Sequence, residues 1–288
     1  MAENATLILP APAKLNLFLH ITGRRADGYH ELQTVFQLLD HGDELRFTLH
    51  AGDELRLRCS GPQQLDDVAD KDNLVLRAAR RLRELSSDEQ PGVDIQLIKR
   101  LPTGGGVGGG SSDAATTLLA LNHLWNLKLD DNTLALLGRE LGADVPVFVR
   151  GDSAWAEGVG EKLTPLPLPE SWYLVIHPGC HVSTQAVFTH PQLTRDPPAI
   201  TIPAFFAGPS RNDCEPLVRR LYPEIDKALI WLEKFGGGRL TGTGACVFAS
   251  FPSAGAALQA HREVPQGWQS FVARGVNRSA AREALPSR

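Results

Sequence analysis

The feature that most constrains this 288-residue chain is its glycine run, Pro102-Thr-Gly-Gly-Gly-Val-Gly-Gly-Gly-Ser-Ser112. Glycine lets a backbone approach an anion closely and adopt a positive φ. The helix expected to follow, from Asp113 on, presents unpaired N–H groups and the positive end of its dipole. The run therefore predicts a loop that holds a phosphate.

A flexible linker is the alternative, because Gly/Ser-rich segments often only connect domains. The flanking sequence argues against it. Residues 93–98 alternate between apolar and polar side chains, which predicts a half-buried strand. Downstream, apolar residues at i, i+4, i+7 and i+11 predict an amphipathic helix, with Ala114, Leu118, Leu121 and Trp125 on its stripe. A loop held between two packed elements favours the phosphate-binding interpretation.

The kind of phosphate loop can be narrowed further. A Walker A loop carries a lysine after its last glycine, but here two serines follow Gly110. The glycines also satisfy G-x-G-x-x-G, with Asp130 about twenty residues beyond, as in a dinucleotide fingerprint. However, Asp130 precedes another helical pattern, closed by Gly142, instead of ending a strand. The dinucleotide interpretation is therefore only a minor alternative.

The whole chain has the composition of a globular protein, with 42% hydrophobic and 22% charged residues. It shows no apolar stretch of membrane-spanning length and no basic region before the first apolar patch, so we expect a cytoplasmic protein with no membrane partner. A net charge of −4 gives no support to a nucleic-acid partner. The four cysteines form no C-x-x-C pair and are expected to be reduced, structural thiols.

The length suggests two domains, with the boundary in the stretch of glycines and prolines between residues 151 and 168. We predict domains at 1–156 and 157–288. A strand from Trp172, a helix over residues 223–235 and a strand over residues 245–251 are expected in the second. The mixture predicts an α+β fold and not an unbroken βα alternation.

Residues 13–21, Ala-Lys-Leu-Asn-Leu-Phe-Leu-His-Ile, alternate strictly and predict a strand. The odd-numbered positions are apolar, whereas Lys14, Asn16, Phe18 and His20 share the other face. A lysine and an asparagine two residues apart can converge on a bound oxyanion or hydroxyl. The pattern alone favours an ordinary solvent-exposed face, since exposed Lys and Asn on strands need no further explanation.

Two aspartates lie beside the predicted helices. Asp113, just inside the helix after the glycines, is interpreted as a first-turn acid that complements the helix dipole, with no catalytic role. Asp144 lies between Gly142 and an apolar segment, residues 145–148. Such a carboxylate is either hydrogen-bonded structurally or tuned for proton transfer, and the sequence alone favours neither.

Two turn segments also have two interpretations each. Asp27-Gly-Tyr-His30 joins a turn to an aromatic ring and an imidazole, so it could bind a planar base or pack on the core. Thr241-Gly-Thr-Gly-Ala-Cys-Val-Phe248 predicts a tight glycine turn that leads into a strand. This turn is either a simple hairpin or a second glycine turn that faces the same ligand as the first.

Three motifs, in this order, resemble those of the GHMP small-molecule kinases: Pro12-Ala-Lys-Leu-Asn-Leu17, Pro102-x-x-x-Gly-Val-Gly-Gly-Gly-Ser-Ser-Asp-Ala-Ala115 and Leu240-Thr-Gly-Thr-Gly-Ala245. Three further segments resemble the branch of that family that phosphorylates 4-diphosphocytidyl-2-C-methyl-D-erythritol. They are Ala26-Asp-Gly-Tyr-His-Glu-Leu-Gln-Thr34, Gly142-Ala-Asp-Val-Pro-Val-Phe148 and Glu157-Gly-Val-Gly-Glu161. The resemblance spans nearly the whole chain.

The resemblance implies transfer of the ATP γ-phosphate to the 2-hydroxyl of this acceptor, a step of the non-mevalonate isoprenoid pathway. It implies the two-domain GHMP kinase fold, with a ribosomal-S5-like N-terminal domain that binds ATP and substrate and a ferredoxin-like C-terminal domain. The sites are expected between the two domains. A monomer or a homodimer is compatible with this resemblance.

On the ATP side, the resemblance places the phosphates on the glycine loop and Asn73 near the adenine. Val107 stands where many members have leucine, an apolar exchange that should leave the loop amides in place. Mg²⁺ is expected as a cofactor with unknown ligands, because it often binds largely through phosphates and waters; Ser111 and Ser112 are the candidates. The residues expected to bind ATP are Asn73, Pro102, Thr103, Gly104, Gly105, Gly106, Val107, Gly108, Gly109, Gly110, Ser111 and Ser112.

On the acceptor side, the resemblance makes Asp144 the base that accepts the hydroxyl proton and Lys14 the cation that holds charge beside it. The expected substrate-binding residues are Asn16 at the methylerythritol end, Tyr29 and His30 at the cytosine, and Thr184 and Phe188 on the opposite side of that base. Two alternatives remain open: a sister kinase that acts on mevalonate or homoserine, and a nucleotide sensor without catalysis.

Overall fold

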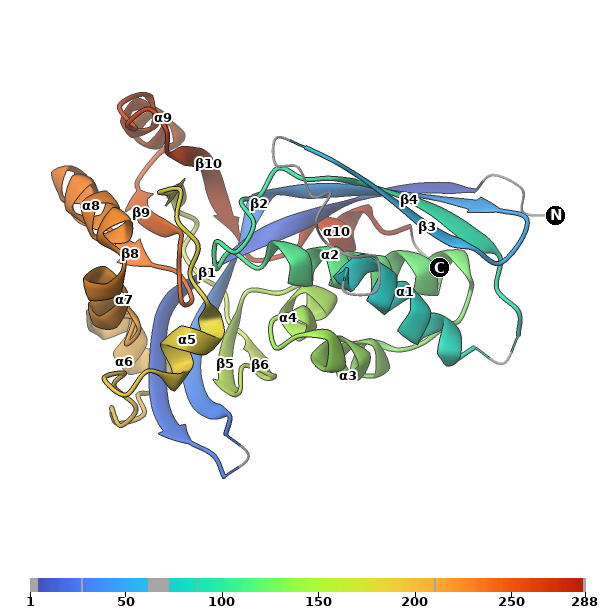
Figure 1. Cartoon of the computed structure of the whole chain (residues 1–288), viewed down its shortest axis with the longest axis horizontal. Helices are drawn as coiled ribbons and strands as arrows, with labels where there is room; N and C mark the ends of the chain where they lie inside the picture. Colours follow the sequence, from blue (N-terminus) through green and yellow to red (C-terminus); the bar gives the residue numbers. More distant parts are fainter. Residues whose placement is uncertain (1–4, 27, 62–72, 87, 210, 287–288) are drawn as a thin grey trace.

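The computed structural model describes residues 5–26, 28–61, 73–86, 88–209 and 211–286. Asp27 and Asp72, which belong to the predicted base-binding turn and to the segment before Asn73, lie outside these ranges. Figure 1 shows two parts joined by long strands, one with α1–α4 and one with α5–α9. Both described ends of the chain lie in the first part.

The strands of both parts belong to a 10-stranded sheet with the main path β3-β4-β2-β10-β7-β9-β8. Off this path, β1 and β5 pair with β2, and β6 pairs with β5. The β3–β4 pair is parallel, and the other pairs between these strands are antiparallel. The bounds are β1 Thr6–Arg24, β2 His30–His50, β3 Leu55–Ser60, β4 Gly92–Ile98, β5 Ala154–Gly158, β6 Lys162–Pro165, β7 Trp172–His177, β8 Arg239–Leu240, β9 Val247–Phe251 and β10 Gln269–Val276.

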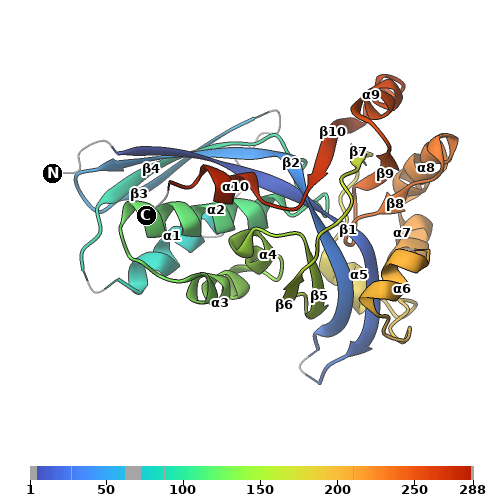
Figure 2. The ribbon, with the colours of Figure 1, turned by 180° about the vertical axis from the view of Figure 1, so that it is seen from behind.

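The helices cover the sheet in two groups. Figures 1 and 2 show α1–α4 together on one face of the β2-β4-β3 region and α7–α9 outside β8–β10. Over the described ranges, no helix has the length and apolar character needed to span a membrane. The bounds are α1 Leu74–Glu84, α2 Gly109–Leu124, α3 Asp131–Leu141, α4 Val145–Arg150, α5 Thr184–Thr189, α6 Ile202–Ala207, α7 Glu215–Leu221, α8 Pro223–Leu232, the 3₁₀ turn η1 Glu233–Phe235, α9 Ala254–Arg262 and α10 Ala280–Ala284.

The β1–β2 hairpin connects the two parts, pairing from Thr6 with Thr48 to Arg24 with His30. The end of the hairpin toward Thr6 and Thr48 packs into the core beneath α1 and α2. The end toward Arg24 and His30 packs into the core of the second part. Three register shifts interrupt β1, so the predicted strict alternation fails. Phe18 joins the same core cluster as Leu15 instead of facing the other way.

The solvent-exposed interpretation of Lys14 and Asn16 is wrong. Their exposed fractions are 2% and 4%, because the glycine loop and the 241–245 turn cover this face of β1. A buried ammonium group needs hydrogen-bond or ion-pair partners. The burial of Lys14 by itself therefore indicates a functional site around this residue.

The helix after the glycine run differs from the prediction in two ways. It begins at Gly109, so the last two glycines and both serines form its first turn, and Asp113 lies beyond that turn. Every residue from Ser112 to Asn122 is buried, because β1 and β2 pack on one side of α2 and α1, α3 and α4 pack on the other. The predicted one-sided stripe is therefore wrong, since α2 is a central helix.

Other predicted elements are confirmed. The strand at 93–98 is β4, the helix after Asp130 is α3, and the strand that starts at Trp172 is β7. The Asp130 side chain caps α3 by accepting a bond from Thr133 N at 2.8 Å, which accounts for this acid without a nucleotide. All four cysteines are free, as predicted; two are buried, and burial raises the pKa of Cys214 to about 12.

The end of the chain returns to the first part. Gly275 and Val276 of β10 pair with β2, and α10 packs against β1. The division into domains at 1–156 and 157–288 stays a prediction.

A buried ion cluster joins β2, the end of β4 and α2. The Lys99 ammonium lies 2.9 Å from Asp113 Oδ2 and also contacts Asp43 Oδ2, and all three side chains are at most 8% exposed. Asp43 Oδ1 accepts the backbone N–H groups of Arg100 and Leu101 at 2.6 and 2.9 Å. The cluster thus fixes the chain where it enters the glycine loop.

We predict that Lys99→Met destabilises the fold strongly, because it leaves two buried carboxylates without their cation. The expected loss in the free energy of unfolding is about 3–5 kcal/mol. Urea denaturation followed by circular dichroism measures it.

The matched control is Arg56→Met, which removes a cation that also contacts two carboxylates, Glu54 and Asp94, but in solvent. This variant should unfold almost like the wild type. Equal stabilities of the two variants would contradict the structural role of the Lys99 cluster.

Candidate active site

The glycine loop turns back on itself before α2. Gly104, Gly106 and Gly108 have φ values of 70°, 73° and 77°, which disfavour other residues. At Gly106 there is also no room, since a Cβ would lie 2.5 Å from the carbonyl oxygen of Thr241. Cys246 N donates to Gly105 O at 3.0 Å, so the second glycine turn faces the first. The 241–246 turn also closes the antiparallel β8–β9 hairpin, so the segment is a hairpin turn that packs against the glycine loop. That both turns face one ligand stays a prediction.

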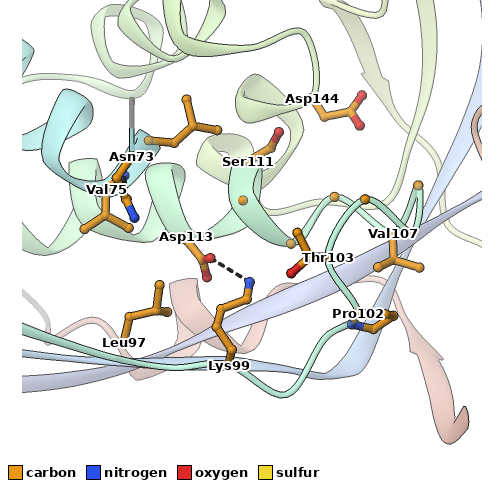
Figure 3. A pocket seen from close by; sticks show the side chains of 17 residues that line it. Asn73, Val75, Leu97, Lys99, Pro102, Thr103, Val107, Ser111, Asp113 and Asp144 are labelled. Carbon is orange, nitrogen blue, oxygen red and sulfur yellow. Dashed lines mark hydrogen bonds and ion pairs between the residues drawn. The ribbon is translucent and has the colours of Figure 1, made fainter. Parts of the chain in front are cut away.

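A cavity of about 360 Å³ lies along this loop, and we call it the glycine-loop cavity. The apolar side chains of Leu74, Val75 and Leu97 form one part of its wall, and the first turn of α2 forms another (Figure 3). The wall therefore combines a surface for a flat apolar group with helix N–H groups for an anion. It is lined by Asn73, Leu74, Val75, Leu97, Lys99, residues 102–111, Asp113 and Asp144.

The predicted ATP-binding residues lie together in this cavity, with one exception. Asn73 caps α1 by accepting a bond from Val75 N at 2.9 Å, so its side-chain oxygen is engaged and its amide NH₂ carries its remaining donors. Ser112 does not line the cavity and is fully buried. Val107 is also buried, in a core cluster, and its carbonyl accepts Lys14 N at 2.9 Å.

Lys99 is the cation of this cavity, and the sequence reasoning missed it. Burial alone would lower its pKa, but the attraction of Asp113 and Asp43 outweighs burial and raises it, so the ammonium stays charged. Figure 3 shows Lys99 pointing from the end of β4 toward Asp113. The alternation of inward and outward side chains along β4 could have indicated that Lys99 is buried, because Lys99 continues the inward face of Val93, Ile95 and Leu97.

Asp113 is not a dipole-complementing first-turn acid. It is 3% exposed and paired with Lys99, and burial raises its pKa to about 7. Its Oδ1 atom is buried without a hydrogen-bond partner among the described residues. Asp113 therefore holds Lys99 in place beside the loop.

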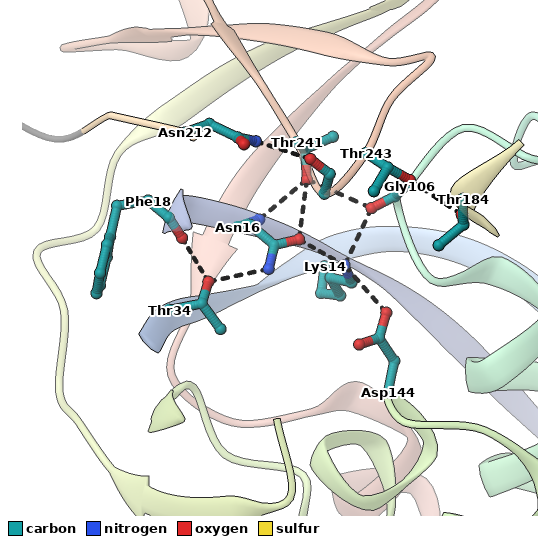
Figure 4. A network of polar contacts seen from close by, with 11 residues as sticks. Lys14, Asn16, Phe18, Thr34, Gly106, Asp144, Thr184, Asn212, Thr241 and Thr243 are labelled. Carbon is teal, nitrogen blue, oxygen red and sulfur yellow. Dashed lines mark hydrogen bonds and ion pairs between the residues drawn. The ribbon is translucent and has the colours of Figure 1, made fainter. Parts of the chain in front are cut away.

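A second buried lysine joins four segments (Figure 4). The Lys14 ammonium lies 2.6 Å from Asn16 Oδ1, 3.0 Å from Gly106 O and 3.1 Å from Asp144 Oδ2. Thr241 Oγ1 accepts from Asn16 N at 3.0 Å and donates toward Gly106 O at 3.3 Å. Lys14 is thus held between β1, the glycine loop, the start of α4 and the 241–245 turn.

A second cavity, of about 240 Å³, lies on the other side of Lys14, and we call it the Lys14 cavity. It shares Gly106, Ser111 and Asp144 with the glycine-loop cavity. The Asp144 side chain is 32% exposed. Asp144 directly precedes α4, but its carboxylate makes no capping hydrogen bond to the helix and can therefore contact a ligand. A phosphate in one cavity and a hydroxyl in the other would meet at this carboxylate, which is the arrangement that phosphoryl transfer requires.

Several predicted acceptor residues line the Lys14 cavity: Lys14, Asn16, Asp144, Thr184 and Phe188. Asn16 donates from Nδ2 to Thr34 Oγ1 at 2.9 Å, which fixes the orientation of its amide. Thr184 Oγ1 lies 3.0 Å from Thr243 Oγ1, across the gap between α5 and the second glycine turn. Thr34 and Thr243 lie within two of the family motifs but were not predicted as site residues, since a threonine in a motif does not by itself indicate a contact with a ligand.

His30 lines neither of these two cavities, but its ring stacks on Phe188 with 5.1 Å between centroids. Burial lowers the pKa of His30, and the charges of Arg195 and Arg24 lower it further, so the imidazole is neutral near pH 7. Arg195 Nε donates to His30 Nε2 at 3.0 Å. The ring proton of the neutral imidazole therefore lies on Nδ1.

Tyr29 and Phe188 line different cavities. It is 65% exposed and lines a third cavity, which we call the Arg139 cavity, with Arg25 and residues 139–143 and 159. This cavity of about 350 Å³ shares Ala143 and Val159 with the Lys14 cavity. The two cavities are therefore neighbours.

The described residues hold no group of three or more His, Cys, Asp or Glu side chains that could chelate a metal ion. Ser111 and Asp144 still offer oxygen atoms where the two main cavities meet. Such a donor set fits Mg²⁺, which takes oxygen ligands and commonly needs only one or two side chains beside phosphates and waters.

The family comparisons agree with this geometry. The model described as "GHMP kinases N terminal domain" matches residues 73–152, which include the glycine loop and Asp144. The model described as "GHMP kinases C terminal" matches residues 195–270.

Two proteins named 4-diphosphocytidyl-2-C-methyl-D-erythritol kinase, from Pseudomonas paraeruginosa and Marinobacter nauticus, are 59% and 55% identical to this chain over 97% of both sequences. A crystal structure of 4-(cytidine 5'-diphospho)-2C-methyl-D-erythritol kinase superposes with a TM-score of 0.81 at 34% identity, covering 94% of this chain and 100% of the other. The predicted α+β fold is thereby confirmed, and the chain belongs to the GHMP kinase family.

Proposed function

We propose that this protein is the ATP-dependent kinase that phosphorylates the 2-hydroxyl of 4-diphosphocytidyl-2-C-methyl-D-erythritol. The observation that most supports this proposal is the position of Asp144, whose carboxylate lines both main cavities and lies 3.1 Å from the Lys14 ammonium. The names of relatives that align along nearly the whole chain support this acceptor.

Membership of a kinase family implies ATP as the phosphoryl donor. In the proposed complex, the adenine lies against Leu74, Val75 and Leu97, close to Asn73. The triphosphate follows the loop to the first turn of α2, where free N–H groups and the helix dipole stabilise it. Lys99 adds a fixed positive charge below this turn, in place of the lysine that a Walker A loop carries.

In the proposed step, the acceptor hydroxyl gives its proton to Asp144 as its oxygen forms a bond to the γ-phosphorus. The bond from that phosphorus to the β,γ-bridging oxygen breaks, and ADP leaves. Lys14, between Asp144 and Gly106 O, stabilises the negative charge that develops on the transferred group. Asn16 positions the hydroxyl through an amide that Thr34 holds.

The cytosine is proposed to lie near Phe188 and Thr184, with Tyr29 and His30 at its other sides. A neutral His30 suits this role, since it avoids burying a charge and offers a single ring donor. Because Tyr29 lines the neighbouring Arg139 cavity, its side chain is proposed to turn toward Phe188 to complete the stacking site.

Mg²⁺ is proposed at the junction of the two cavities, near Ser111 and Asp144. When bound, it would neutralise charge on the phosphates. The assignment of Ser111 and Asp144 as its protein ligands is part of this proposal.

The alternatives are less well supported. Structures of a homoserine kinase and a mevalonate kinase superpose with TM-scores of 0.69 at 19% and 17% identity, which shows the shared fold alone. Neither homoserine nor mevalonate carries a ring for the His30–Phe188 stack. A nucleotide sensor without catalysis would not need a second cavity that shares a carboxylate with the first.

Asp144→Asn should lower kcat by at least about 10²-fold while ATP binding persists, because the amide cannot accept the hydroxyl proton. Steady-state phosphorylation of 4-diphosphocytidyl-2-C-methyl-D-erythritol gives kcat, and calorimetry gives ATP affinity.

The matched control is Asp152→Asn, which alters a carboxylate of similar exposure (33%) that pairs with Arg278 at 2.7 Å and lines neither cavity. This control should keep wild-type turnover. Asp144→Asn with near-wild-type kcat would remove Asp144 from the role of base.

Phe188→Ala should raise KM for the cytidylated acceptor about tenfold or more, since stacking on a base is worth roughly 1–3 kcal/mol. KM for ATP should hardly change, because Phe188 does not line the glycine-loop cavity. Initial-rate kinetics with each substrate varied in turn measure both constants.

Phe235→Ala serves as the control, because Phe235 is also a half-buried aromatic of the second core, where it packs on Trp231. A similar rise in both KM values for Phe188→Ala would argue against an acceptor-side role for this ring.

A further inference from the structure

Arg195 joins the segment that carries Phe188 to the start of β2. Its Nε atom donates to His30 Nε2 at 3.0 Å, and its Nη1 atom donates to the carbonyl oxygen of Leu193 at 3.0 Å. Its Nη2 atom donates to the carbonyl oxygens of Phe188 and His190 at 2.9 and 2.7 Å. All three guanidinium nitrogens are therefore bonded to the protein, which favours a role in holding these groups over direct contact with a ligand.

The Arg195 contact fixes which nitrogen of the His30 ring can donate. Arginine N–H groups are donors only, so His30 Nε2 must accept in this contact. Burial lowers the pKa of His30, and the charges of Arg195 and Arg24 lower it further, so the ring is neutral near pH 7. A neutral imidazole has one ring proton, which must then lie on Nδ1. Arg195 thereby makes His30 a donor at one defined atom.

This donor is left available to a ligand. Arg195 makes the only hydrogen bond to the His30 side chain in the described part of the chain. His30 Nδ1 is also not one of the fully buried side-chain atoms without a partner, so it can be reached from outside the protein.

The same guanidinium holds the ring that stacks on His30. The His30 and Phe188 rings lie 5.1 Å apart between centroids with 28° between their planes, and Arg195 is bonded to both residues. Phe188 lines the Lys14 cavity. Arg195 therefore keeps the His30 donor beside an aromatic wall of the cavity that is proposed to take the cytidylated substrate.

A fixed donor distinguishes the two common pyrimidines. Cytosine presents two adjacent hydrogen-bond acceptors, N3 and O2, whereas uracil carries a proton on N3. An Nδ1–H group directed at this edge pairs with cytosine but meets a second donor on uracil, and such an unpaired donor is an effective means of rejection. A His30 ring with its proton on Nε2 would present an acceptor instead and would lose this preference.

We propose that Arg195 is a positioning residue that fixes His30 as an Nδ1–H donor and thereby makes the site select cytosine over uracil. This inference rests on the proposed function, and it deepens that function by naming the residue that orients the histidine beside the base.

The first test is calorimetric binding of cytidine 5'-diphosphate and uridine 5'-diphosphate to the full chain. The two probes differ only in the base. A non-hydrolysable ATP analogue saturates the glycine-loop cavity, so that neither probe binds there. The wild type should prefer the cytidine probe about tenfold or more, because uracil loses one hydrogen bond and leaves a donor unpaired. Arg195→Met should lose most of this preference.

The second test observes the His30 ring directly. Nitrogen-15 NMR distinguishes the two neutral tautomers of imidazole, and the His30 signals are identified by their absence in His30→Gln. At pH 7 the wild type should carry the ring proton on Nδ1 alone. In Arg195→Met both tautomers should be populated, because nothing then requires Nε2 to accept. A purely structural role of Arg195 would leave the tautomer unchanged.

The matched control is Arg83→Met. Arg83 is also half-buried, donates to the backbone carbonyls of Asp53 and Pro91, and lies over the Trp125 ring. It lines none of the three cavities. This variant should keep both the wild-type preference for the cytidine probe and the proton on His30 Nδ1.

The inference is overturned if the wild type binds both probes equally, or if its His30 carries a proton on Nε2. It is also overturned if Arg195→Met keeps the wild-type preference or the single Nδ1–H tautomer. A nitrogen–nitrogen coupling across the Arg195–His30 hydrogen bond, measured in the wild type, tests the contact without any variant. Its absence would contradict the inference even where Arg195→Met fails to fold.

Turnover separates this inference from the proposed function. A wild-type protein that does not phosphorylate the cytidylated substrate contradicts the proposed function, whatever the binding data show. Arg195→Met with a wild-type KM for that substrate contradicts the role of Arg195 and leaves the proposed function intact. The expected result is a raised KM for the cytidylated substrate with an unchanged KM for ATP.

Discussion

The buried ammonium of Lys14 is the interaction on which the site depends. A cation removed from solvent must be surrounded by acceptors, and Lys14 obtains them from Asn16, Gly106 and Asp144. These partners belong to different segments, so satisfying one charge fixes β1, the glycine loop and the start of α4 relative to each other. The two cavities meet at this point because the same contacts form their common wall.

Lys99 plays a corresponding part at the other end of the glycine-loop cavity. It pairs with two buried carboxylates, and one of them also holds the backbone that leads into the loop. The loop therefore needs no lysine of its own, because Lys99, directly after β4, places a cation beside it. Binding groups are thus placed by tertiary contacts, whereas the glycines supply only backbone shape and amides.

The fold elements that depend on local pattern could be predicted from the sequence. β4, α3 and β7 follow from hydrophobic period and end signals, and the order of the three motifs indicated the family. The strict alternation of β1 could not hold, because bulges depend on the partner strand. The same limit explains why α2 was expected to be one-sided: the residues of α2 do not show that three separate helices, α1, α3 and α4, pack against its other face.

The candidate site was predictable only in part, for the same reason. The glycine run was found from its residues, and the likeness to a family brought in Lys14 and Asp144. The burial of Lys14 was missed because nothing near it in sequence covers it. Asp113 was misread because its partner, Lys99, lies on another element. The other predicted binding residues could not be derived from local sequence pattern, because their roles depend on contacts with bound ligands and not on neighbouring residues.

The proposed reaction requires one ligand in each main cavity, with both ligands meeting at Asp144. A crystal structure with a non-hydrolysable ATP analogue and 4-diphosphocytidyl-2-C-methyl-D-erythritol tests it most directly. We expect the γ-phosphate at the first turn of α2 and the 2-hydroxyl oxygen within hydrogen-bond distance of the Asp144 carboxylate, in line with the phosphorus. A hydroxyl held away from Asp144, or an acceptor bound outside the Lys14 cavity, would contradict it.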